Sequence, residues 1–169
     1  VAVPTTAGTG SEATTVTVIT DSVRHIKRLL VHESLMPDLA IIDACLMLGV
    51  PQNVTAATGM DALAHAIEAY VATGATSMTQ ALAYRAISLI GEALPIVVGN
   101  GNDVAARESM ASASYMAGIA FSNAGLGLCH AMSHQIGAAY GVPHGVANAI
   151  MLPSVMHYNQ LVCKKSYPE

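Results

Sequence analysis

An aspartate and a histidine lie four residues apart in the alanine-rich stretch GMDALAHAIEAY, residues 59–70. On a helix, positions i and i+4 lie one above the other on one face, so Asp61 and His65 would point the same way. Glu68 follows three residues after His65, on nearly the same stripe. Such a pair is a surface contact, a buried polar contact or half of a metal site. The spacing alone does not choose between these three interpretations.

Three more histidines gather in GLGLCHAMSHQIGAAYGVPHG, residues 125–145. His130 and His134 share a helix face, as two ligands of one metal ion would. His144 stands between a proline and a glycine, a setting that suits a ligand on a loop between two helices. Each histidine could instead be a core residue bonded to backbone carbonyls. Three of them within fifteen residues, beside almost no other polar side chains, favour a metal cluster.

The types of the candidate ligands limit which metal ions could bind. Cys129 would point away from the face that carries His130, so the donors are imidazoles and one carboxylate rather than thiolates. That donor set suits Fe²⁺, Zn²⁺, Co²⁺ or Mn²⁺, and the spacing cannot separate them. With Asp61 and His65 the count reaches four protein ligands. Positions then remain open for a substrate oxygen on a metal that can expand its coordination.

A glycine- and threonine-rich loop, PTTAGTGSE, spans residues 4–12 between two predicted strands. Its glycines permit close backbone approach, and hydroxyls with free N–H groups can bind phosphate oxygens. The loop is neither a P-loop nor G-x-G-x-x-G. A plain hairpin loop is therefore the favoured interpretation of these residues taken alone.

The composition restricts the class of protein. Hydrophobic residues make up 53% of the 169 residues and charged residues only 11%, so the chain can bury a sizeable core but has little charge for a monomer's surface. We therefore expect a homo-oligomer. Both ends also look like cuts through a longer protein. The net charge of −4 gives no sign of a positively charged surface patch, so we expect no nucleic-acid partner.

The cysteines and the apolar stretches predict a cytoplasmic protein without a membrane segment. The three cysteines are scattered and read as reduced thiols, and no signal peptide opens the chain. The most membrane-like stretch, residues 115–132, is interrupted by polar residues and rich in small ones. A buried helix explains this stretch better than a lipid bilayer does.

Two kinds of secondary structure must position these residues. The first forty-odd residues are β-like, with VAVP, TTVTVIT, KRLLVH and LAIID as candidate strands. Apolar residues then recur with a period of 3.6, which predicts helices at about 53–73, 77–92, 103–121, 126–140 and 145–160. The expected breaks lie at Gly74, from Pro95 to Gly101, at Gly125 and from Gly141 to Pro143. Pro153 should kink or end a turn of the last helix.

With these segments in order, the chain resembles the iron-containing (group III) alcohol dehydrogenases. The motifs that carry the resemblance are PTTAGTGSE, AIIDACLM, ATGMDALAHAIEAY, FSNAGLGLCHAMSHQIGAAYGVPHGVANAIMLP and MHYN. Within the family, the motifs are most similar to those of lactaldehyde reductases, which are propanediol oxidoreductases. Family members are more than twice as long and begin with a nucleotide-binding half.

The resemblance implies a mainly α fold of the dehydroquinate synthase-like type. Residues 48–169 would form a helical metal-binding domain, and residues 1–47 a short β-rich remnant of the α/β nucleotide-binding domain. The implied metal is Fe²⁺, with Zn²⁺ or another divalent ion possible, and the implied ligands are Asp61, His65, His130 and His144. The resemblance makes His134 a residue beside the substrate that relays a proton, which overrides its pairing with His130. It leaves Glu68 as a partner of one of the ligands.

The implied activity is hydride transfer between a small alcohol or diol, or its aldehyde, and NAD or NADP, with the metal as a Lewis acid. The family's cofactor contacts fall on Thr5, Thr6, Thr9 and Lys27. Phe121, the one phenylalanine of the chain, matches a position that lines the substrate pocket.

Two other functions remain open from the sequence. The chain could be a non-catalytic metal-binding fragment or assembly module that lacks a complete cofactor site. It could also be a sugar-phosphate cyclase such as dehydroquinate synthase, which shares the fold and uses a metal and NAD. A cyclase needs Lys or Arg in its cleft, and the helical part offers only Arg85 and Arg107 before its tail.

Overall fold

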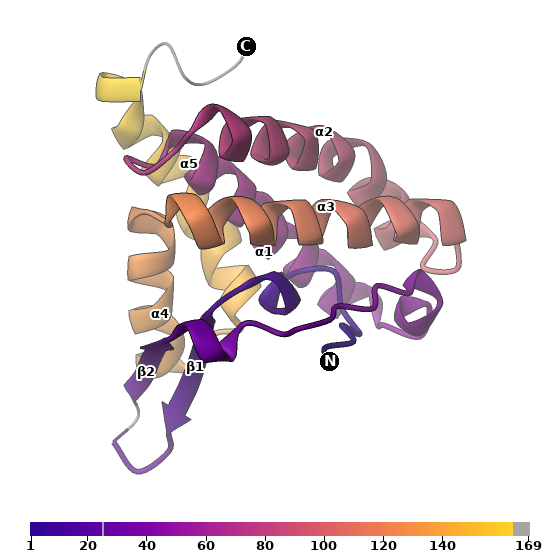
Figure 1. Cartoon of the computed structure of the whole chain (residues 1–169), viewed down its shortest axis with the longest axis horizontal. Coiled ribbons are helices and arrows are strands. Elements are labelled where there is room, and N and C mark those ends of the chain that lie inside the picture. Colours follow the sequence, from indigo (N-terminus) through magenta and orange to yellow (C-terminus); the bar gives the residue numbers. More distant parts are fainter. Residues whose placement is uncertain (25, 164–169) are drawn as a thin grey trace.

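The computed structural model describes residues 1–24 and 26–163 of the chain. Among them, five α-helices dominate: α1 Gln52–Val71, α2 Ser77–Gly99, α3 Val104–Ala124, α4 Leu128–Tyr140 and α5 His144–Cys163. In Figure 1, α2 and α3 run side by side, and α4 and α5 lie at one end of them. The mainly helical fold expected from the sequence is confirmed.

A two-stranded hairpin precedes the helices. Strand β1, Val16–Asp21, pairs antiparallel with β2, Ile26–Val31, and the hairpin projects beside α4 (Figure 1). The β-branched run TTVTVIT accounts for β1. The two outer candidate strands, VAVP and LAIID, are not strands: they make one parallel bridge, between Ala2 and Ala40. A strand needs a neighbour along its length, and the described residues supply none to these two segments.

The helix ends follow local rules. Thr76 and Thr79 form a reciprocal capping box at the start of α2, and Asp103 accepts the backbone N–H of Ala106 at the start of α3. Gly125 and Gly141 end α3 and α4 with φ of 89° and 67°, values that a residue with a Cβ rarely adopts. The breaks predicted at these two glycines are confirmed.

The break predicted from Pro95 to Gly101 begins later than expected, at Asn100. Helix α2 continues through Pro95 to Gly99, although proline has no N–H to donate. Val97 beyond it is 1% exposed, and the Asn100 N–H donates to the Ile96 carbonyl at 2.7 Å. Burial of the last turn therefore outweighs the lost hydrogen bond.

Two expectations at the last helix also need correction. Pro153 does not end α5, which runs on to Cys163 with Val155 buried one turn later. His144 does not lie on a loop but is the first residue of α5, since the Ala147 N–H already donates to the Pro143 carbonyl. The site histidine therefore sits on a rigid element rather than on a connecting segment.

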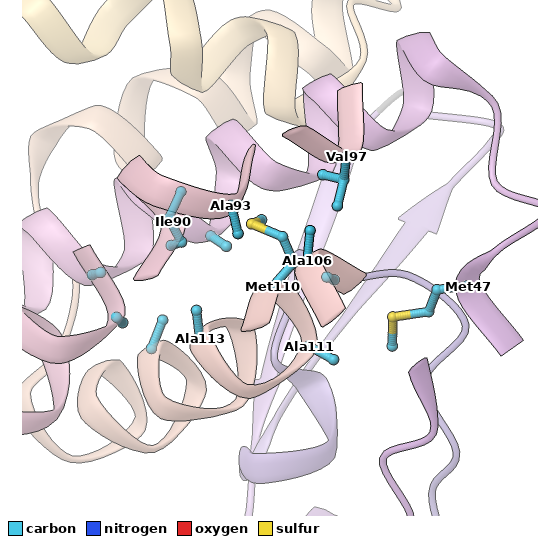
Figure 2. Packing of buried hydrophobic residues seen from close by; sticks show 13 residues of the cluster. Met47, Ile90, Ala93, Val97, Ala106, Met110, Ala111 and Ala113 are labelled. Carbon is cyan, nitrogen blue, oxygen red and sulfur yellow. The ribbon is translucent and has the colours of Figure 1, made fainter. Parts of the chain in front are cut away.

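Small side chains hold the helices together. A core cluster lies between α1, α2 and α3, and Figure 2 shows its buried side chains. Met47, Ile90, Val97 and Met110 supply its larger side chains. The buried alanines of this cluster are Ala7, Ala62, Ala66, Ala86, Ala93, Ala106, Ala111, Ala113 and Ala117. A second cluster, around Cys129 and Leu152, joins α1 to α4 and α5. The two clusters fix α1 in the middle of the molecule.

Helix α2 is long and apolar enough to cross a membrane by length and composition, with a mean hydropathy of 1.6. It packs against both α1 and α3, and Ala83 and Ile90 are fully buried there. One such helix is also typical of the core of a soluble protein. The stretch 115–132, which looked most membrane-like in the sequence, is split between α3 and α4 by Gly125.

Candidate metal centre

Three helices bring the four predicted ligands together. Asp61 and His65 lie on α1, and both are buried with His130 of α4; their donor atoms all lie within 4.8 Å of one another. His144 joins from the start of α5, with Nε2 3.5 Å from Asp61 Oδ1. The Nε2 atom of His130 lies 3.7 Å from the same oxygen. Asp61 is therefore the common neighbour of the two distant histidines.

Two glycines allow these helix starts to lie so close. A Cβ on Gly145 would lie 1.9 Å from the backbone oxygen of Ala57, so only glycine lets the first turn of α5 rest against α1. A Cβ on Gly127 would lie 2.9 Å from Oε1 of Glu68. Both glycines directly adjoin the turns that carry His130 and His144.

The rings of the cluster are stacked in a defined order. His65 lies between Phe121 and His130, with ring centroids 4.4 and 4.3 Å away and nearly parallel planes. His144 meets His130 edge-on at 5.3 Å, and His134 meets His144 edge-on at 4.9 Å. The structure thus places His134 next to the cluster, half-buried, while Phe121 covers one face of His65.

Glu68 links two parts of the site. Its Oε2 lies 2.5 Å from His130 Nδ1 and also accepts the His130 N–H at 3.3 Å, and its Oε1 accepts the Cys129 N–H at 2.7 Å. The carboxylate therefore caps the first turn of α4 and orients the imidazole at the same time. With Nδ1 directed at a carboxylate, the other nitrogen, Nε2, faces Asp61.

The charges of the cluster follow from burial and from these contacts. Burial alone would raise the pKa of Asp61, but His130, His65 and His144 outweigh it and hold that pKa well below its usual range. Burial lowers the pKa of His65 to about 4, although Asp61 opposes the shift. Neutral imidazole and ionised carboxylate are the forms that bind a metal ion. The donor set of this cluster therefore fits a divalent cation.

His130 differs from His65 in its environment. Burial alone would lower the pKa of His130, but hydrogen bonds and charge from Asp61 and Glu68 outweigh it and raise that pKa. Glu68 is held below its usual pKa, since His130 and the Cys129 N–H more than offset burial. Asp61 and Glu68 therefore flank His130 as two carboxylates on opposite sides of one ring.

The sequence analysis missed Asn148. This residue is fully buried, and its Nδ2 lies 2.6 Å from Asp61 Oδ1, 3.1 Å from His130 Nε2 and 3.2 Å from His144 Nε2. The available signal was its position: Asn148 follows His144 by four residues and so shares its helix face. A neutral amide carries none of the charge or imidazole chemistry that marks a metal ligand in a sequence.

A cleft of about 430 Å³ opens over the cluster. It is bounded by the glycine/threonine loop, the hairpin and the histidine helices, and its lining residues include Thr9, Ser11, Thr14, Val18, Thr20, Leu29, Asp61, His65, Phe121, His130, His134 and His144. The structure therefore brings one predicted cofactor residue, the predicted substrate residue and the metal cluster to one cavity.

The other predicted cofactor residues are placed differently. Thr5 and Thr6 are described but are not among the residues that line the cleft. The backbone of Lys27 lies in β2 opposite Thr20, whose side chain lines the cleft. The side chain of Lys27 lies outside what the structure describes.

The two arginines of the helical part lie away from the cleft. The guanidinium of buried Arg107 donates to the Gly101 carbonyl at 2.9 Å, to Thr55 Oγ1 at 3.0 Å and to the Val50 carbonyl at 3.3 Å. Arg85 is exposed on α2, and neither arginine lines the cavity. Arg107 therefore ties the start of α1 to the α2–α3 turn, which counts against a phosphate-binding cyclase site.

The sequence of this chain is similar to those of known proteins. The sequence profile of the Fe-containing alcohol dehydrogenase family, C-terminal part, matches residues 55–169, and that of iron-containing alcohol dehydrogenase matches residues 1–44. The Escherichia coli protein named probable alcohol dehydrogenase EutG is 62% identical over all 169 residues, which cover 43% of its length. The NAD-dependent methanol dehydrogenase of Bacillus methanolicus is 55% identical over 94% of this chain and 42% of its own.

Solved structures give the same result. The chain superposes on 1,3-propanediol oxidoreductase with a TM-score of 0.91 at 50% identity, covering 94% of this chain and 42% of that one. It superposes on sulfoacetaldehyde reductase from Bifidobacterium kashiwanohense, solved in complex with NAD⁺, with a TM-score of 0.89 at 38% identity, covering 93% and 42%. The chain thus spans less than half the length of the relatives that it matches.

Proposed function

Because this chain belongs to the Fe-containing alcohol dehydrogenase family, we propose that it is the metal-binding part of an oxidoreductase that acts on small alcohols. The reaction is hydride transfer between a small alcohol or diol, or its aldehyde, and NAD or NADP. The observation that carries the proposal is the buried group of Asp61, His65 and His130 beneath a cleft that Thr9 also lines.

The proposed ligands are Asp61, His65, His130 and His144, and the proposed ion is Fe²⁺, with Zn²⁺ or another divalent ion as a substitute. Imidazoles with one carboxylate suit these metals. When bound, the ion supplies a Lewis acid that lowers the pKa of an alcohol. Glu68 supports the assignment, because a proton held on Nδ1 of His130 leaves Nε2 as the donor atom.

The remaining residues around the cleft have separate proposed roles. His134 is half-buried at the cavity and lies edge-on to His144, so it can pass a proton between a bound alcohol and solvent. Phe121 packs on His65 and presents an apolar wall to the carbon side of a small substrate. Substrate size is supported by relatives named for methanol, 1-propanol and 1,3-propanediol.

Cofactor binding is proposed for Thr5, Thr6, Thr9 and Lys27. Thr9 has geometric support, because it lines the cleft with the metal cluster. The other three rest on the family resemblance alone. Residues 1–47 are proposed as part of a nucleotide-binding domain and 48–169 as the metal domain, a division supported by separate profile matches to 1–44 and 55–169. The free thiols fit the cytoplasm, which we propose as its location.

One observation favours a second function: the chain covers only 43% of the length of the Escherichia coli protein named probable alcohol dehydrogenase EutG. The chain would then be a metal-binding module that cannot bind the nucleotide. Under this alternative the metal cluster stabilises the helices, and turnover depends on residues supplied from elsewhere.

Metal analysis and nucleotide titration together test the two functions. The purified chain should hold one divalent ion and lose it on chelation, and NADH fluorescence should change on titration of the metal-loaded chain. We expect a dissociation constant for NADH in the millimolar range, which corresponds to a binding free energy of about −4 kcal/mol. The reason is that the chain has no Gly-rich loop to hold the pyrophosphate. Metal without any NADH binding supports the module, and failure to bind metal contradicts both. An assay on 1,2-propanediol and 1-propanol follows if NADH binds.

A further inference from the structure

Asn148 occupies the middle of the polar cluster, and we propose that it is a positioning residue of the metal centre. Its amide nitrogen holds the donor atoms of Asp61, His130 and His144 together in the absence of an ion. The inference rests on the proposed function in one respect, that this cluster binds a metal.

The distances define the contacts. Nδ2 of Asn148 lies 2.6 Å from Asp61 Oδ1, and 3.1 and 3.2 Å from the Nε2 atoms of His130 and His144. The three donor atoms come from three different helices, α1, α4 and α5. One amide nitrogen is therefore the shared neighbour of all three, and it lies closer to them than the 3.7 and 3.5 Å that separate Nε2 of His130 and of His144 from Asp61 Oδ1.

The orientation of the amide follows from chemistry. If the amide were turned over, Oδ1 would lie 2.6 Å from the Asp61 carboxylate, and two acceptors at that distance repel each other. On its other side, Oδ1 lies 3.6 Å from Sγ of Cys129, whose S–H is a weak donor. The amide nitrogen therefore faces the ligands and the amide oxygen faces the thiol.

Burial makes this contact energetically important. Asn148 is fully buried, and Asp61 is 3% exposed. An ionised carboxylate without hydrogen bonds is costly in such surroundings, so the amide N–H stabilises the form of Asp61 that binds a cation. The hydrogen bond to Asp61 can persist beside an ion, because a carboxylate oxygen has more than one lone pair, whereas Nε2 of His130 and of His144 each has one lone pair and exchanges the amide for the ion on binding. Holding a ligating carboxylate by a second residue typically raises metal affinity about 10- to 100-fold.

The test compares Asn148→Ala with a matched control, Asn123→Ala, whose parent side chain is exposed on α3 and, among the described residues, donates to the Ile119 carbonyl of its own helix. Zn²⁺ affinity is measured by competition with a chelating dye, and the melting temperature is measured with and without Zn²⁺. We expect Asn148→Ala to bind Zn²⁺ about 10- to 100-fold more weakly than the parent and to melt at a lower temperature without metal. Asn123→Ala should match the parent in affinity.

A second variant separates positioning from packing. Asn148→Asp has nearly the same shape but places a carboxylate oxygen against Asp61, so the metal-free form should melt lower and Zn²⁺ should raise its melting temperature by more than in the parent. Parent-like Zn²⁺ affinity in the alanine variant, or a parent-like Zn²⁺ shift in the aspartate variant, overturns the inference. A parent chain that binds no Zn²⁺ overturns the proposed function. The inference then fails with it, because no metal ion remains for Asn148 to position.

Discussion

Glu68 and His130 are joined by a hydrogen bond of 2.5 Å between Oε2 and Nδ1, with both side chains buried. Glu68 lies in the last turn of α1, and His130 lies in the first turn of α4. The same carboxylate accepts the Cys129 N–H. One side chain thus sets both the direction in which α4 begins and the nitrogen that His130 presents to Asp61.

Replacing Glu68 should therefore affect metal binding and helix α4 together. We expect Glu68→Ala to weaken metal binding about 10- to 100-fold, because His130 loses the partner that fixes its ring. It should also destabilise the fold, since the first turn of α4 loses its cap. Glu68→Gln should fall between the parent and the alanine variant. Glu92→Gln, at an exposed position on α2, is the control. Unchanged metal affinity in Glu68→Ala would show that the contact is only structural.

Single alanine variants can test the ligand set. His130→Ala and His144→Ala should each abolish tight metal binding, because each removes one of few donors. His134→Ala should retain the ion, since His134 lies beside the cluster, and it serves as the matched control. Metal content after dialysis against a mild chelator is the measurement. Full occupancy in the His144 variant would refute the ligand assignment.

The close approach at Gly145 makes a prediction about backbone packing. Gly145→Ala should lower the free energy of unfolding by about 1–3 kcal/mol or more. The new Cβ would overlap the Ala57 carbonyl and push α5 away from α1. The metal affinity of this variant should fall with the displacement of His144. Gly91→Ala, in α2 with nothing within 4 Å of its Cβ, should instead stabilise the chain by about 0.4–1 kcal/mol. Urea unfolding of both variants measures the contrast, and equal effects would contradict the packing argument.

Glu12 predicts a pH dependence. It lies in the glycine/threonine loop, is 6% exposed, and burial raises its pKa. Because the folded pKa lies above the unfolded one, the stability linked to this group is fully present below the unfolded value, about 4.3. That stability is lost as the pH rises through the folded pKa. Glu12→Gln should therefore melt progressively higher than the parent between pH 4 and pH 8. A constant difference across that range would rule the mechanism out.

The hairpin predicts self-association. Ile19, Leu29 and Val31 are more than half exposed, and each strand has one unpaired edge among the described residues. We expect the chain to form dimers or larger assemblies at micromolar concentration, measured by light scattering. Changing Ile19 and Leu29 to Thr should shift the distribution towards monomer. A monodisperse parent monomer would count against the prediction.

Much of the helical part could be predicted because its signals are local. The pair Asp61 and His65 was visible from a spacing of four, and the glycines at 125 and 141 marked the helix ends. The grouping of His130 and His144 with that pair depended on a family resemblance. No local pattern says that the far end of a chain folds back onto α1.

The errors came from interactions between distant segments. Pro95 looked like a helix end because the cost of a proline is local, whereas the burial of Val97 that offsets it depends on packing with other helices. Asn148 has no local sequence signal, because its importance arises from contacts with Asp61 and His130, which belong to other helices. Burial and tertiary hydrogen bonds decided both cases.

The alanines between α1, α2 and α3 have a consequence for how the site keeps its shape. An alanine side chain has no rotamers, so burying it costs no side-chain entropy and leaves no alternative packing to adopt. Interfaces such as that of Ala62, Ala66 and Ala113 therefore bring the helix backbones close together. The helix that carries Asp61 and His65 cannot adjust to strain by rearranging its neighbours. It must move as a whole or stay in place, which suits an element that presents two donors at a fixed separation.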